Sequence, residues 1–294
     1  MSLSALYDLP APAKLNLFLH VVGRRPDGYH LLQSVFTLID WCDTLHVERR
    51  TDGRISRQDL GPTLPEDDLC TRAARALQAA SGTTQGAHIA IDKQVPWGAG
   101  LGGGSSDAAT TLIALNRLWG LHWPRDRLLA LGLTLGADVP FFIGGRNAWV
   151  EGIGEQLTPI TLPPARYVVL KPPVAVPTSA IFSSPLLTRD TPQTTMAVFL
   201  ERPKSFGKND LQASAEAYST QIVDGLEILK QNFGLSRMSG SGSAVFAPCD
   251  GLPQESSAEA SVERVRGLAT PGSGWVTRHC IGMDCHPLLD WCSN

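Results

Sequence analysis

The densest group of residues with chemical potential is a glycine-rich segment, Pro-Trp-Gly-Ala-Gly-Leu-Gly-Gly-Gly-Ser-Ser-Asp-Ala, at residues 96–108. Glycines allow a ligand to approach the backbone closely, and apolar residues at helical spacing follow over 105–119. The first turn of a helix offers unpaired N–H groups and a partial positive charge, which suit phosphate oxygens. The segment predicts a phosphate-binding loop, with a flexible turn as the alternative. Ser105 or Ser106 is expected to cap the helix.

Two common nucleotide-binding motifs fit this loop poorly. Gly98, Gly100 and Gly103 match the dinucleotide pattern G-x-G-x-x-G, but Pro96 and polar residues separate them from the preceding strand. A second helix, rather than a strand, is also expected after Gly120. A Walker A loop carries a lysine directly after its glycines, and none follows here. A lysine for phosphate chemistry must therefore come from elsewhere in the chain.

Two polar groups outside the loop are candidates to act with it. Residues 13–21 alternate with period two, which predicts a strand with leucines on one face and Lys14 with Asn16 on the other. A solvated strand edge is the alternative for this pair. Asp138 is a lone acid in the turn over 136–140, and an ordinary turn aspartate is its alternative. A second glycine loop occupies 239–243 and runs into a predicted strand that reaches residue 246.

The elements that must position these residues are a mixture of strands and helices. Residues 13–21 and 31–39, joined by a turn over 23–28, predict a β-hairpin or meander. The remaining predicted elements are helices over 66–80, 105–119, 125–135 and most of 211–231, strands over 88–92 and 167–170, and a polar loop over 250–261. The proline-rich stretch 162–164 is the best domain boundary, which predicts domains at 1–164 and 165–294.

Composition excludes several classes of protein. The 294 residues hold 25 basic and 28 acidic side chains, a formal charge of −3, so no strong field favours nucleic acid or an anionic membrane. No apolar run approaches the ~20 residues that span a bilayer. Six cysteines show no disulfide framework. We expect a cytoplasmic protein with reduced thiols and no nucleic-acid or membrane partner.

Three segments, in order, resemble the GHMP kinase superfamily: 12–17 with 25–30, then 96–108, then 237–246. The resemblance extends from about residue 12 to about residue 288. It implies an α+β, two-domain GHMP kinase fold, with an N-terminal domain like domain 2 of ribosomal protein S5 and an α/β sandwich as the C-terminal domain. The active site would then lie in the cleft between the domains.

The resemblance also implies roles for individual residues. Lys14 and Asp138 match the catalytic lysine and aspartate. Ser106 is a candidate magnesium ligand. The residues that match the ATP phosphate loop are Pro96, Trp97, Gly98, Ala99, Gly100, Leu101, Gly102, Gly103, Gly104, Ser105 and Ser106. Two residues depart from the family pattern, because Trp97 replaces a methionine or smaller residue and Asp68 replaces an asparagine.

On the substrate side, Tyr29 and Phe182 match positions whose rings sandwich a cytidine base, while His30 matches a residue that hydrogen-bonds its polar edge. Asn16 would lie within reach of the substrate. The second glycine loop contributes further substrate-binding residues by the same match, namely Ser239, Gly240, Ser241 and Gly242.

The implied activity is transfer of the γ-phosphoryl group of ATP, with Mg²⁺, to the 2-hydroxyl of 4-diphosphocytidyl-2-C-methyl-D-erythritol, by a monomer or weak homodimer. Another GHMP kinase, acting on homoserine, mevalonate or a sugar, is the first alternative. The cytidine set disfavours it, because a small substrate without a base does not need two stacking rings. A non-catalytic nucleotide-binding protein is the second alternative, and the presence of both Lys14 and Asp138 disfavours it.

Overall fold

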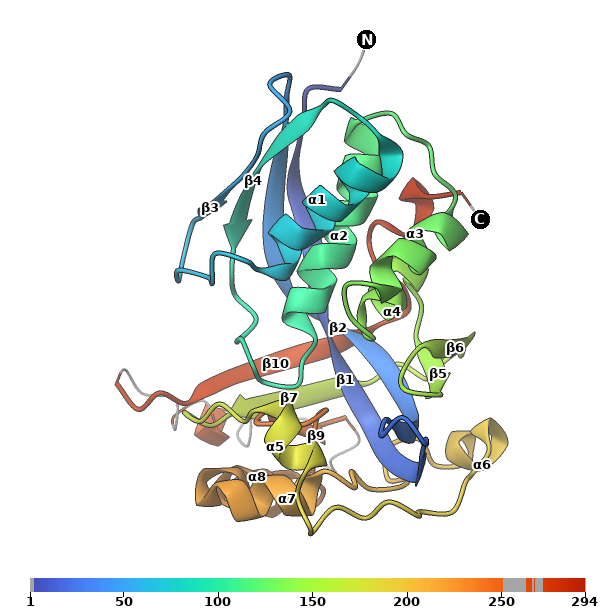
Figure 1. Cartoon of the computed structure of the whole chain (residues 1–294). Coiled ribbons are helices and arrows are strands. Elements are labelled where there is room, and N and C mark those ends of the chain that lie inside the picture. The colour runs from blue at the N-terminus through green and yellow to red at the C-terminus, as the bar shows by residue number, and fades with distance from the viewer. Residues whose placement is uncertain (1–2, 251–262, 266, 268–271, 294) are drawn as a thin grey trace.

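A long antiparallel hairpin forms the spine of the molecule in this computed structural model, which describes residues 3–250, 263–265, 267 and 272–293 (Figure 1). Strand β1 (Ala5–Arg24) pairs with β2 (His30–Arg50), which confirms the predicted hairpin. The register shifts between Pro12 and Ala13 and again between Asn16 and Leu19. Such bulges re-aim side chains, and these two flank Lys14 and Asn16.

The hairpin belongs to one sheet of ten strands among the described residues, and this sheet runs through both halves of the chain. Its main path is β3-β4-β2-β10-β7-β9-β8, with β1 and β5 added on β2 and β6 added on β5. The other strands are β3 (Ile55–Asp59), β4 (Gly86–Asp92), β5 (Ala148–Glu151), β6 (Gln156–Pro159), β7 (Arg166–Lys171), β8 (Arg237–Met238), β9 (Val245–Pro248) and β10 (Val276–Met283).

Two groups of helices cover the sheet at opposite ends of the molecule (Figure 1). One apolar cluster joins the first four helices to β1, β2 and β4, and another joins the last two to β7 and β9. The helices are α1 (Leu69–Ser81), α2 (Gly103–Leu118), α3 (Arg125–Leu133), α4 (Val139–Gly144), α5 (Thr178–Phe182), α6 (Met196–Leu200), α7 (Gln212–Tyr218) and α8 (Thr220–Phe233). The observed mixture of helices and strands confirms the predicted α+β class.

Local sequence signals account for the ends of some helices but not of others. Asp68 caps α1 by accepting hydrogen bonds from the N–H groups of Cys70 and Thr71, and Gly82 ends the helix in the left-handed conformation. The prediction that Ser105 or Ser106 caps the next helix is wrong. Gly102 occupies that position with φ 73°, so helix α2 begins at Gly103 and both serines lie inside its first turn.

The helical stretch predicted over 211–231 is interrupted at one residue. Ser219 adopts an extended conformation, with φ −154° and ψ 127°, which ends α7. Its side chain accepts a hydrogen bond from the N–H of Gln221 and so caps α8. The polar loop predicted over 250–261 lies almost wholly outside the described residues.

The last part of the chain returns to the first part. Strand β10 pairs with β7 and then, at Gly282 and Met283, with β2. Residues 285–292 follow it and pack beside α3 and α4, with Leu288 and Cys292 in the first apolar cluster (Figure 1). The division into 1–164 and 165–294 remains a prediction.

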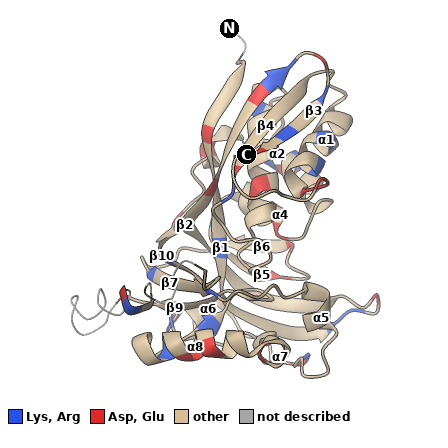
Figure 2. Ribbon diagram, turned by 90° about the vertical axis from the view of Figure 1, so that its left-hand side faces the viewer, with Lys and Arg blue, Asp and Glu red and all other residues tan. Residues whose placement is uncertain are grey.

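Charged residues and cysteines are distributed through the described structure. Basic and acidic residues are interspersed along the ribbon rather than gathered by sign (Figure 2). All six cysteines are free thiols. In the part of the chain that the structure describes, no helix is long and apolar enough to cross a membrane.

Candidate functional site

The two glycine loops meet at the centre of the molecule. The predicted phosphate loop, residues 96–106, packs against the second glycine loop, residues 239–243. The Oγ atom of Ser239 donates to the carbonyl of Gly100 at 3.0 Å, and the N–H of Ala244 donates to the carbonyl of Ala99 at 3.0 Å. Gly100 has φ 74°, and a Cβ atom there would lie 2.1 Å from the carbonyl oxygen of Ser239. Only glycine permits this contact, which joins segments far apart in the sequence.

Lys14 lies directly beneath the phosphate loop and faces Asp138. Its backbone N–H donates to the carbonyl of Leu101 at 2.9 Å. Its buried Nζ lies 2.5 Å from Oδ1 of Asn16, 3.5 Å from Oδ2 of Asp138 and 4.5 Å from the centroid of the Phe36 ring. Asp138 precedes α4 but makes no capping hydrogen bond with its side chain, which leaves the carboxylate for Lys14. The structure therefore brings the two predicted catalytic residues together.

Asn16 links Lys14 to its surroundings. Its side-chain amide donates to Oγ of Ser34 at 3.1 Å, and its backbone N–H donates to Oγ of Ser239 at 3.2 Å. The amide oxygen is therefore oriented toward the ammonium of Lys14. These bonds fix the lysine between β1, β2 and the second glycine loop.

Two adjoining cavities open around this centre. The inner one, about 310 Å³, is lined by residues that include Lys14, Asp138, Gly100 and Gly240. The outer one, about 880 Å³, is lined by Tyr29, His30 and Phe182 among others. Residues shared by both linings are Leu32, Ala137, Ile153, Thr178 and Phe182. The two cavities therefore adjoin, with the rings in one and the Lys14–Asp138 pair in the other.

The outer cavity contains the residues expected to hold a base. The rings of His30 and Phe182 lie with centroids 5.0 Å apart and an angle of 32° between their planes. Tyr29 lies at the same cavity with 60% of its surface exposed. The structure brings the three residues to one cavity, while the sandwich of a base between Tyr29 and Phe182 remains a prediction.

Two residues that support the site were not identified from the sequence. Asn209, nearly fully buried, donates from its side-chain amide to the carbonyls of Met238 and Gly240, each at 2.8 Å, and so shapes the second glycine loop. Arg189 donates to His30. Both bind mainly to backbone carbonyls, and such contacts leave no periodicity or motif in the sequence. A polar pair, Asn209–Asp210, just before a helix was the only available signal.

A buried ionic group supports the chain where it enters the phosphate loop. The Nζ atom of Lys93 contacts Asp43 and lies 2.6 Å from Oδ2 of Asp107, while Asp43 also accepts from the N–H groups of Gln94 and Val95. Burial lowers the pKa of Lys93, but the two carboxylates outweigh it and raise that pKa above its usual value. Burial raises the pKa of Asp107. These contacts tie β2, the loop and α2 together.

The predicted magnesium ligand has a property that fits a bound ion. Ser106 is fully buried, and its Oγ has no hydrogen-bond partner among the described residues. A buried hydroxyl without a partner costs on the order of 1–3 kcal/mol. A hard cation that accepts oxygen ligands would remove that cost.

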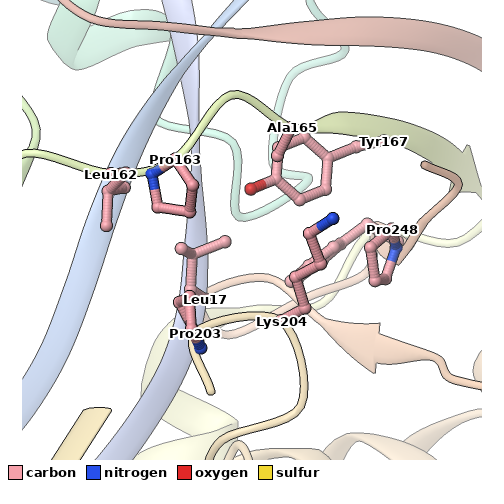
Figure 3. A pocket seen from close by; sticks show the side chains of 9 residues that line it. Leu17, Leu162, Pro163, Ala165, Tyr167, Pro203, Lys204 and Pro248 are labelled. Carbon is pink, nitrogen blue, oxygen red and sulfur yellow. The ribbon is translucent and has the colours of Figure 1, made fainter. Parts of the chain in front are cut away.

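A third hollow, lined by Leu17, Tyr167 and Lys204 among others, lies away from this site (Figure 3). Its volume of about 20 Å³ is enough for roughly one water molecule. It has no room for a nucleotide.

The family described as "GHMP kinases N terminal domain" matches residues 68–146. The chain is 64% identical over 291 residues to a protein of Methylibium petroleiphilum named 4-diphosphocytidyl-2-C-methyl-D-erythritol kinase, covering 99% of both chains. A protein of the same name from Ralstonia pickettii is 58% identical, with 96% of each chain covered.

Solved structures resemble the whole chain as well. A crystal structure of 4-(cytidine 5'-diphospho)-2C-methyl-D-erythritol kinase superimposes with a TM-score of 0.78 at 35% identity, covering 94% of this chain and 99% of that one. The mevalonate kinase of Methanococcus jannaschii gives a TM-score of 0.68 at 13% identity and covers 95% of this chain. At that identity the second likeness concerns the fold alone.

Proposed function

Because this chain belongs to the 4-diphosphocytidyl-2-C-methyl-D-erythritol kinases of the GHMP superfamily, we propose that the inner cavity is where it transfers phosphate. The enzyme moves the γ-phosphoryl group of ATP to the 2-hydroxyl of that cytidyl alcohol, giving the 2-phosphate and ADP, in the non-mevalonate route to isoprenoid precursors. One observation supports the location above all: Lys14 Nζ and Asp138 Oδ2 lie 3.5 Å apart beneath the phosphate loop.

The pair supplies what the acceptor oxygen needs. The hydroxyl of the substrate donates a hydrogen bond to Asp138, which is placed to take its proton as the oxygen bonds to the γ-phosphorus. The bond between that phosphorus and the bridging oxygen of ADP breaks. Lys14 offsets negative charge on the transferring group, and its short contacts fix its position before the substrate arrives.

The phosphate loop holds the donor. Its backbone N–H groups and the first turn of α2 bind the phosphates of ATP, and Gly98, at φ 65° with open space beside it, leaves room for them. The Ser106 hydroxyl would hold Mg²⁺. When bound, the ion would offset the negative charge of the phosphates.

The outer cavity holds the cytidine end of the acceptor. Tyr29, His30 and Phe182 line it, and Thr178 connects this end to the second glycine loop through a 2.9 Å hydrogen bond with Ser241. Asn16 reaches the acceptor arm from the inner cavity. A cytoplasmic location and a monomeric or weakly dimeric state remain predictions.

A coupled assay of ADP release tests the activity and the acceptor together. The enzyme with Mg-ATP is given the diphosphocytidyl alcohol, homoserine, mevalonate or galactose, each beside a control without acceptor. We expect turnover with the cytidyl substrate alone. Turnover with another acceptor only would overturn the assignment of the outer cavity, and no turnover from folded, ATP-binding protein would overturn the catalytic role of the pair.

A further inference from the structure

Arg189 binds both sides of the outer cavity. Its Nε donates to Nε2 of His30, at the start of β2, at 3.2 Å. Its Nη2 donates to the carbonyls of Phe182 and Ser184 at 3.1 and 3.0 Å, and its Nη1 to the carbonyl of Leu187 at 3.1 Å. One half-buried side chain therefore connects the base-binding end of the hairpin to the segment that follows α5.

This contact determines where the proton on His30 lies. A guanidinium group has five N–H donors and no acceptor, so the imidazole nitrogen that it faces must present a lone pair. The ring is then neutral and carries its proton on the other nitrogen, Nδ1. Nowhere in the described ranges does a protein group hydrogen-bond to Nδ1 of His30. The cavity thus contains a single ring N–H donor that is free for a ligand.

We propose that Arg189 is a positioning residue that holds His30 as the Nδ1–H tautomer, so that the outer cavity selects cytosine over uracil. The inference rests on the proposed function, which places the base in this cavity. Cytosine presents a lone pair at N3, which the Nδ1–H group can satisfy. Uracil presents an N–H group at N3, so two donors would face each other and both would lack a partner.

The surrounding charges favour the same neutral ring. Burial, followed by the positive charges of Arg189 and Arg24, lowers the pKa of His30. Arg24 lines the same cavity but donates to the carbonyl of Gly28 at 3.1 Å and does not bond to the imidazole. Arg24 therefore offers a matched control, because it contributes charge to His30 without directing its tautomer.

The test combines a spectroscopic and a kinetic readout on the full chain. Histidine labelled with ¹⁵N reports the tautomer of His30 at pH 7.5, with the signal assigned by its loss in His30→Gln. The ratio of kcat/KM for the diphosphocytidyl substrate to that for its uridyl analogue reports base selection. Both are measured for the wild type, Arg189→Met, Arg189→Lys and Arg24→Met.

We expect the Nδ1–H signature in the wild type and in Arg24→Met, and a mixture of tautomers in Arg189→Met. The cytidyl-to-uridyl ratio should fall about tenfold or more in Arg189→Met, because an unpaired polar contact no longer penalises uracil. Arg189→Lys should recover part of the Nδ1–H population and part of the cytidyl-to-uridyl ratio, since lysine retains a donor. A merely structural role would raise KM for both substrates and leave their ratio unchanged.

Three results would count against the inference. An Nε2–H tautomer or a protonated ring in the wild type would overturn it. So would a change of tautomer in Arg189→Met with an unchanged ratio. If the wild type turned over neither substrate, the proposed function would fail, while the tautomer would still be decided by the spectra of the free enzyme.

Discussion

The ammonium group of Lys14 lies close to three groups of different chemistry. These are the amide oxygen of Asn16, the carboxylate of Asp138 and the face of the Phe36 ring. Each of these partners restricts the ammonium from another direction. Asn16 is itself held by Ser34 and Ser239. Such a supporting shell keeps a catalytic group within the narrow range of positions that phosphoryl transfer requires.

Replacing either member of the pair should therefore remove turnover without unfolding the enzyme. We expect Lys14→Met and Asp138→Asn to lower kcat by at least about 10²-fold, the magnitude seen when one group that stabilises transition-state charge is lost. Coupled ADP release measures kcat, and thermal unfolding checks the fold. The double variant should be little slower than either single one, because the two residues act together.

The exposed Lys230, on α8 far along the chain, provides the control. Lys230→Met should leave kcat unchanged. A near-normal kcat in Lys14→Met or Asp138→Asn would show that the pair is not the catalytic centre.

At the scale of elements, periodicity and turn residues predicted most strands and helices, including the hairpin and the helix after the glycine loop. Contacts between residues far apart in the sequence determined the features that these signals did not predict. Gly102, not a serine, is the N-cap residue of α2, because the glycine loop turns close to Lys14 and Phe142, from which a Cβ at this position would lie only about 3 Å away. The two proposed catalytic residues were identified by resemblance, whereas Arg189 was not, since its bonds to carbonyls depend on the fold.

The segment after β10 contains a buried histidine that makes the stability of the fold sensitive to pH. His286 is buried beside α2, and its Nδ1 accepts from the N–H of Leu288 at 3.0 Å. Burial, with Arg125 nearby, lowers the pKa of this ring to about 4. Protonation would remove the acceptor, so the native state favours the neutral ring.

The sign of the effect follows from linkage. The unfolded chain binds a proton near pH 6.5 and the native state only near pH 4, so the stabilisation is complete above pH 6.5 and is lost as the pH falls to about 4. The loss amounts to at most about 3 kcal/mol. Denaturant unfolding of the wild type and His286→Gln from pH 7.5 to 4 measures it, and the variant should show the smaller dependence.

The exposed His122, which lies between α2 and α3, is the control for His286. His122→Gln should follow the wild-type pH dependence. Equal slopes for the wild type and His286→Gln would contradict the assignment.

For the whole molecule, β10 is the strand that unites the two halves. It pairs with β7 on one side and β2 on the other, and the residues after it enter the core beside α3 and α4. Arg125 secures that return by donating to the carbonyls of Ile143, Leu289 and Cys292. Neither half can lose its structure without exposing apolar surface of the other.

We therefore expect one cooperative thermal transition rather than two. Scanning calorimetry should give a calorimetric enthalpy equal to the van't Hoff enthalpy. Arg125→Met should lower the temperature of that single transition and leave it undivided. Two separate transitions in the wild type would show that the halves unfold independently.

The β1–β2 hairpin fixes the distance between the two ends of the proposed substrate site. Lys14 lies in the middle of β1 and His30 at the first residue of β2, and continuous pairing of the two strands, interrupted only by bulges, fixes the interval between them. A strand of set rise does not stretch. If the base lies at His30 and the hydroxyl at Asp138, as proposed, the diphosphate arm of the acceptor must match that interval, and a cytidyl alcohol with a shorter arm would leave its hydroxyl short of Asp138. On this proposal the enzyme selects its acceptor by length as well as by base and hydroxyl.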